Sequence, residues 1–99
     1  MAAYQVARVS AAMAARIREL DAEAKAVGIE KDYRAALRRV YRRLASDPTE
    51  FGEPTFTLSK LGLRNYVVIL APIVVEYCVD EPRKIVYLRT INLLLPRKV

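Results

Sequence analysis

Residues 65–91, NYVVILAPIVVEYCVDEPRKIVYLRTI, form the stretch that decides the fold. The stretch is rich in β-branched and aromatic residues, which fit a pleated sheet. Two breaks divide it, Ala71-Pro72 and the Asp-Glu-Pro-Arg run at 80–83, and both carry residues that favour tight turns. The sequence therefore predicts three consecutive antiparallel strands joined by hairpins, at residues 65–71, 73–79 and 84–91.

The middle strand shows how the predicted sheet divides into two faces. Side chains alternate along a strand, so one face carries Ile73, Val75, Tyr77 and Val79. The other face carries Val74, Glu76 and Cys78. We expect one face to pack on helices and the other to be concave, partly apolar and able to receive a ligand. Cys78 is read as a small buried hydrophobe.

A strand and a helix are expected at the start of the chain. Residues 4–9 alternate and predict a short first strand. Ser10 is predicted to be the N-cap, because its hydroxyl can accept a hydrogen bond from an amide of the first turn. Helical spacing then joins Met13, Ile17, Leu20, Ala24 and Val27 in one apolar stripe. Gly28 is expected to end this helix in the left-handed conformation.

A second helix is predicted from residues 30–32 onward, where acids suit the positive end of a helix. Its buried stripe is Leu37, Val40, Tyr41 and Leu44. Pro48 ends it, because the residue before a proline is disfavoured in the α region. Residues 51–54 are expected to be loop, and 56–61 either a short edge strand or irregular. The two helices form a hairpin.

Five arginines on the second helix are the most informative polar feature. They form two i,i+4 rows, and no acid lies among them: Arg34, Arg38 and Arg42, and Arg39 and Arg43. In a chain of net charge +6, such a face suggests a polyanionic partner, either nucleic acid or an acidic protein. The alternative is a solvated surface that keeps a basic protein in solution. Lys60 and Arg64 can extend this patch.

Two further features have two readings each. Arg89 lies inside an apolar strand, where it either pairs with Glu76 on the neighbouring strand or faces a ligand. Residues 93–95 are three consecutive leucines, which cannot all face one core in a strand. They either continue the core or cover a partner helix or a second copy of this chain.

Composition limits the chemistry and the location. The 99 residues predict a single domain, 1–99, and contain no histidine and one cysteine. A Ser-His or Cys-His pair and an ordinary zinc site are therefore excluded, and no cofactor or metal is expected. The most apolar stretch, 66–75, is shorter than the ~20 residues of a spanning helix. The N-terminus does not resemble a signal peptide, so we expect a soluble, cytoplasmic protein without a membrane partner.

The predicted order of a strand, a helical hairpin and an antiparallel meander, in one small basic domain, resembles the RelE/ParE superfamily of type II toxins. The Asp-Pro at 47–48, followed by Phe-Gly-Glu-Pro at 51–54, looks like the helix exit of many members. Val-Glu-Tyr-Cys-Val-Asp-Glu at 75–81 looks like the third strand and turn of the family. Ile-Val-Tyr-Leu-Arg-Thr-Ile at 85–91 looks like its final strand. The similarity covers residues 4–95.

The resemblance implies two different activities. RelE-like members cut messenger RNA on the ribosome with lysines and arginines of the sheet, often with a C-terminal tyrosine. ParE-like members inhibit DNA gyrase and lack that catalytic set. Members of both kinds are neutralised by a small antitoxin whose C-terminal segment wraps the toxin.

The RelE catalytic cations do not carry over to this chain. Residues 67–69, where lysines are expected, are Val-Val-Ile, and Ile73-Val74 stand where an arginine is expected. Residues 92–95 are Asn-Leu-Leu-Leu, and Arg97 and Lys98 follow only after Pro96. No tyrosine follows Tyr87. Cleavage by the RelE mechanism is therefore not expected.

The sequence predicts an α+β domain of the RelE/ParE type that acts as the toxin, or a toxin-derived member, of a toxin–antitoxin pair. It is expected to bind a cellular target, such as the ribosome or gyrase, rather than to cut RNA. Two alternatives stay open. One is a ribosome-dependent endoribonuclease with relocated cations at Lys60, Arg64 or Arg89. The other is a non-toxic module that binds nucleic acid. A cognate antitoxin is the expected partner, and a homo-oligomer is an alternative.

Overall fold

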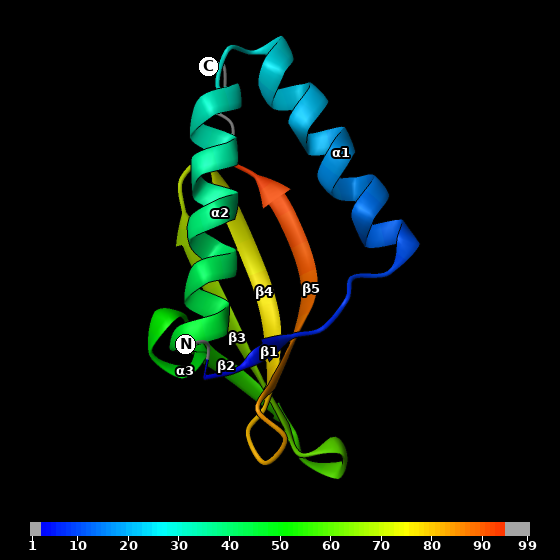
Figure 1. Ribbon diagram of the computed structural model, residues 1–99, viewed down its shortest axis with the longest axis vertical. Coiled ribbons are helices and arrows are strands. Elements are labelled where there is room, and N and C mark those ends of the chain that lie inside the picture. The colour runs from blue at the N-terminus through cyan, green and yellow to red at the C-terminus, as the bar shows by residue number, and fades with distance from the viewer. Residues whose placement is uncertain (1–2, 95–99) are drawn as a thin grey trace.

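The computed structural model describes residues 3–94 and confirms the α+β class. Two long helices lie on the same face of a five-stranded mixed sheet (Figure 1). The elements along the chain are β1 (Gln5–Val6), α1 (Ala11–Ala26), α2 (Glu30–Ser46), α3 (Pro48–Phe51), β2 (Glu53–Leu58), the 3₁₀ turn η1 (Ser59–Leu61), β3 (Leu63–Leu70), β4 (Ile73–Asp80) and β5 (Ile85–Leu93).

The predicted meander is the centre of the sheet, whose strand order is β1-β5-β4-β3-β2. β3, β4 and β5 are antiparallel and are joined at the two predicted breaks. The first strand is shorter than expected: only two residues, Gln5 and Val6, pair in parallel with β5. This pairing joins chain segments about eighty positions apart, which a local alternation pattern at 4–9 cannot reveal.

The two ends of α1 lie where the sequence signals predicted them. The Ser10 hydroxyl accepts a hydrogen bond from the Met13 amide at 3.0 Å, which confirms the N-cap. Gly28 has a φ of +79°, so it takes the left-handed conformation that ends α1. Val27, the last residue of the predicted apolar stripe, is the C-cap of α1 and is 55% exposed, so it does not share the burial of Leu20 and Ala24.

The turn after α2 differs from the expected loop. Pro48 does end the long helix, but it also begins the four-residue helix α3, because a proline suits the first position of a helix. β2 then begins at Glu53, so only Gly52 separates the two elements. Residues 56–61, expected to be either a short edge strand or irregular, form the end of the edge strand β2 and the η1 turn.

The hydrophobic core lies between the helices and one face of the sheet. It includes the predicted strand face, with Tyr77 fully buried, and the predicted stripe of α2 except Leu37 and Tyr41, which are half-buried. The buried apolar residues are Leu20, Ala24, Tyr33, Ala36, Val40, Leu44, Tyr66, Ile73, Val75, Tyr77, Val79, Val86 and Ile91. The opposite sheet face has no helix over it in the described chain (Figure 1).

Candidate functional site

The five arginines of α2 do not act as one patch, because two of them are held in ion pairs. Arg34 donates two hydrogen bonds to the carboxylate of Asp21 on α1, at 2.9 and 3.0 Å. Arg43 donates two to Asp47, at 2.7 and 2.8 Å, and its guanidinium lies 4.7 Å from the centre of the Phe51 ring. These two arginines tie α2 to its neighbours and so contribute to the fold.

Three arginines remain exposed on α2, namely Arg38, Arg39 and Arg42, and we call them the basic trio. Within residues 3–94 none of the three has a carboxylate within 4 Å. Their charges are therefore available to a partner, which the ion-paired arginines are not. The trio is the part of the predicted arginine face that stays unneutralised.

The contact between Arg34 and Asp21 shows which side of α2 faces α1. Leu37 and Tyr41 lie three and seven residues after Arg34, so they share this side. Both are half-buried, as are Met13 and Ile17 on α1. Met13 and Ile17 lie eight and four residues before Asp21, so helical spacing places them on the side of α1 that faces α2. We call the space between these two sides, bordered by Met13, Ile17, Leu37 and Tyr41, the helix groove.

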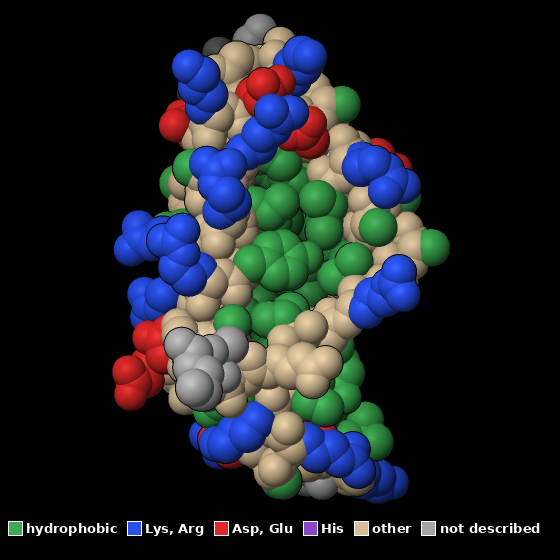
Figure 2. Space-filling model, in the orientation of Figure 1, with side chains coloured by type: hydrophobic (Ala, Val, Ile, Leu, Met, Phe, Trp, Pro, Cys, Tyr) green, Lys and Arg blue, Asp and Glu red, His purple; other side chains and the backbone are tan. Residues whose placement is uncertain are grey.

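The helix groove is an open, apolar hollow. Tyr33, in the first turn of α2, donates from its hydroxyl to the carbonyl of Ile17 in the middle of α1 at 2.8 Å, and so holds the two helices together. Away from the turn that connects them, the helices diverge (Figure 1). Figure 2 shows apolar side chains exposed between the diverging helices, with Lys and Arg side chains along both rims. Burial raises the pKa of Tyr41, so its phenol, already neutral at physiological pH, gives up its proton less readily than an exposed tyrosine does.

The uncovered sheet face holds a polar network around Asn65, which is fully buried. Its amide nitrogen donates to the Thr55 hydroxyl at 2.6 Å and to the Glu76 carboxylate at 3.3 Å. Its amide oxygen accepts from the Cys78 thiol at 3.5 Å and from Arg89 at 2.9 Å. One side chain thus links β2, β3, β4 and β5.

Arg89 is held by this network and not by an ion pair. The pairs Glu76–Thr90 and Tyr77–Leu88 are consecutive in the β4–β5 register, so Arg89 is the extra residue of a bulge. Its guanidinium donates to Asn65 and lies 5.5 Å from the centre of the Phe56 ring. Within the described chain no carboxylate lies within 4 Å of it, so the expected pair with Glu76 is absent.

The other predicted site residues are spread over different surfaces. Lys60 is exposed on η1. Arg64 precedes Asn65 on β3 and therefore points to the opposite face, where it lines a hollow of about 650 Å³ with Tyr66. The structure thus separates Arg64 from Arg89.

The remaining sequence expectations concern a cysteine, three leucines and the membrane. Cys78 is 2% exposed, and burial raises the pKa of its thiol, which matches the expected buried hydrophobe. Leu93 packs against the core, whereas Leu94 is 44% exposed. Leu95, Arg97 and Lys98 lie outside the described residues. No helix in residues 3–94 has both the length and the apolarity to cross a membrane.

Comparison with protein-family models, with curated proteins and with solved structures found no match. The RelE/ParE resemblance therefore rests on the residues quoted from the sequence. Sequence reasoning missed the helix groove and the Asn65 network. Asn65 could have been noticed as a polar residue in an apolar strand. The groove depends on the angle between two helices, and no residue pattern in the sequence indicated that angle.

Proposed function

We propose that this chain is the toxin, or a toxin-derived member, of a type II toxin–antitoxin pair and acts by binding rather than by cutting RNA. The observation that carries the proposal is the helix groove. An apolar hollow with cationic rims suits an acidic amphipathic segment, whose apolar side enters the hollow while its carboxylates face the rims. A small antitoxin can supply such a segment by folding as it binds.

The half-buried side chains of the groove provide the attraction. Burial of apolar area contributes roughly 25 cal/mol per Å². A helical segment that covers the half-buried Met13, Ile17, Leu37 and Tyr41 removes their remaining apolar area from water, which favours binding. Arg38 lies on the groove side of α2, one turn after Arg34, and has no carboxylate partner in the described chain. It can therefore pair with an acid of the bound segment.

A nuclease receives less support. Cleavage of a phosphodiester needs cations and proton-transfer groups gathered around one phosphate. Arg64 and Arg89 lie on opposite faces of the sheet, and the guanidinium of Arg89 is bound to a neutral amide. The non-toxic nucleic-acid-binding alternative rests on the basic trio alone.

Growth of a bacterial host after tightly controlled induction of this chain tests the proposal. We expect growth arrest without new ribosome-dependent RNA 5′ ends. Normal growth with soluble protein present would refute the toxin assignment. New cleavage sites would instead support the endoribonuclease.

A selection for rescue then tests the groove. Clones from a genomic library of the source organism that restore growth are challenged with Leu37→Glu and with the control Lys60→Glu, which lies on η1. We expect Leu37→Glu to remain toxic but to escape rescue, while Lys60→Glu is still rescued. Equal rescue of both variants would remove the groove from antitoxin binding.

A further inference from the structure

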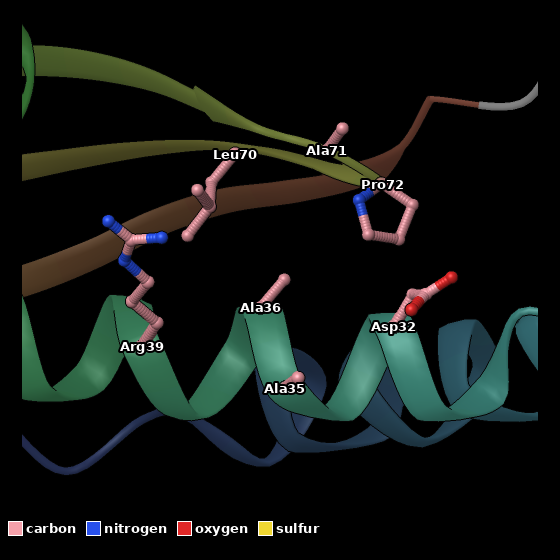
Figure 3. Close-up of a pocket in the computed structure, with 7 residues that line it drawn as sticks. All are labelled: Asp32, Ala35, Ala36, Arg39, Leu70, Ala71 and Pro72. Atoms are coloured by element: carbon pink, nitrogen blue, oxygen red, sulfur yellow. The ribbon is translucent and has the colours of Figure 1, made fainter.

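A second hollow, of about 360 Å³, lies on the other side of α2, between this helix and the β3–β4 hairpin. Figure 3 shows its lining: Ala35 and Ala36 lie between Asp32 and Arg39 along α2, while Leu70 and Pro72 come from the hairpin. Asp32 and Arg39 are seven residues apart, about 10 Å along the helix axis. Within residues 3–94 neither has a partner of opposite charge within 4 Å.

The order of these residues is self-complementary. When two α2 helices lie antiparallel across an axis near the alanines, Asp32 of each meets Arg39 of the other. Opposite charges then meet twice, as a two-fold interface requires, because each residue is used in both directions. Ala35 is exposed and small, so it permits close approach of the two helices.

The neighbouring hairpin offers apolar surface beside the same axis. The register of β2 with β3 extends no further than Val67, so residues 68–70 at the end of β3 have no pairing partner in β2. Ile69 alternates onto the uncovered face of the sheet, so the apolar surface beside α2 comes from Leu70 and Pro72, which are half-buried. Exposed strand edges and accessible apolar side chains are typical of surfaces that associate.

We propose that α2 and the β3–β4 hairpin form an interface between two copies of this chain, related by a two-fold axis near Ala35 and Ala36. The interface uses the Arg39 side of α2, whereas the helix groove uses the Arg34 side. A dimer therefore leaves the helix groove open to its own partner. This inference is independent of the proposed toxin function.

Sedimentation equilibrium over a range of protein concentrations tests the interface. We expect the native chain to dimerise, and Asp32→Arg or Arg39→Asp alone to weaken the dimer at least about tenfold, because each places like charges together twice. An equimolar mixture of the two variants should form heterodimers, since both contacts between positions 32 and 39 then join opposite charges again. A native chain that stays monomeric at every concentration would overturn the proposal.

Two further variants make the result specific. Arg38→Asp changes charge by the same amount on the adjacent residue, but on the groove side, and should dimerise like the native chain. Ala35→Arg places a cation against itself at the axis and should give monomers. Circular dichroism checks that each variant is folded. If Ala35→Arg and both charge reversals dimerise as strongly as the native chain, the interface lies elsewhere and the proposal is refuted. The proposal is also refuted if Arg38→Asp weakens the dimer as much as Arg39→Asp does.

Discussion

Gly52 leaves open the space that the Tyr77 hydroxyl occupies. A Cβ atom at position 52 would lie 2.6 Å from that hydroxyl oxygen and 2.9 Å from the carbonyl oxygen of Val67. The same hydroxyl donates to the Pro48 carbonyl at 2.5 Å. The close approach of residue 52 to β4 thus lets a buried tyrosine bind the first residue of α3 and fixes how the chain passes from α2 into the sheet.

Replacing Gly52 with Ala should lower the free energy of unfolding by about 1–3 kcal/mol, the usual cost of overpacking a closed site. The added methyl cannot be accommodated without moving Tyr77 or the β3 backbone. Urea denaturation of both proteins measures the difference. A loss below about 0.5 kcal/mol, the range of ordinary surface changes, would show that the site relaxes freely.

Tyr77→Phe provides the partner for a double-mutant cycle with Gly52→Ala. Removing the hydroxyl eliminates the closest contact of the added methyl, although the Val67 carbonyl remains. The two losses should therefore sum to more than the loss in the double variant, by about 0.5 kcal/mol or more. Strict additivity would contradict direct contact between the two sites.

The sequence predicted the meander well because its signals are local. The three apolar runs are separated by turn residues, and the strands begin and end within two residues of the expected positions. The parallel pairing of β1 and the bulge at Arg89 were not predicted. Both depend on segments distant in the chain: β1 pairs with β5, and the bulge appears only when β4 and β5 are aligned.

Alkaline solution should destabilise the protein through its buried tyrosines. Burial raises the pKa of both Tyr33 and Tyr77 to about 12, from an ordinary value of 10.0. The folded state therefore keeps protons that the unfolded chain releases. This contribution is fully present below the unfolded pKa and is lost as the pH rises through the folded one.

The free energy of unfolding should fall between pH 10 and about 12, by at most about 1.4 kcal/mol per pH unit for each phenol. Urea denaturation across this range measures the slope. Tyr77→Phe removes one titrating group and should make the slope shallower. A native slope that the substitution leaves unchanged would show that Tyr77 does not contribute.

Arg42 and Arg43 are adjacent in the chain, but only Arg43 makes contacts that stabilise the fold. Arg43→Ala should lower the free energy of unfolding more than Arg42→Ala, because only Arg43 binds Asp47 and lies over Phe51. The hydrogen bonds from Arg43 lower the pKa of Asp47. Stability from this pair is therefore present above the ordinary pKa of an aspartate and is lost as the pH falls through the lowered one.

Thermal denaturation of both variants and of the native chain, from neutral pH downward, tests this difference. The gap between the native chain and Arg43→Ala should narrow below about pH 4, the ordinary range for an aspartate. The gap for Arg42→Ala should stay constant. A pH-independent gap for Arg43→Ala would indicate that its contact with Phe51, and not the ion pair, is what stabilises α3.

The candidate surfaces were less predictable than the fold. Helical spacing placed all five arginines on one helix, but it could not show that Asp21 and Asp47 neutralise two of them. Asp21 belongs to another helix, and Asp47 meets Arg43 only where α2 ends. Because these two arginines are paired, the predicted face of five arginines is reduced to the basic trio.

The basic trio should carry whatever affinity the chain has for nucleic acid. Each phosphate contact on a duplex contributes about 0.9 to the slope of log affinity against log salt concentration. Replacement of Arg38, Arg39 and Arg42 by Ala should therefore reduce this slope by about 2–3 for a mixed-sequence DNA duplex. The control is Arg34→Ala with Arg43→Ala, which removes two cations that already have carboxylate partners. Fluorescence anisotropy over a salt series measures the slope for the native chain and for both variants. If all three slopes are equal, the exposed face of α2 does not contact nucleic acid, and its role is limited to protein partners.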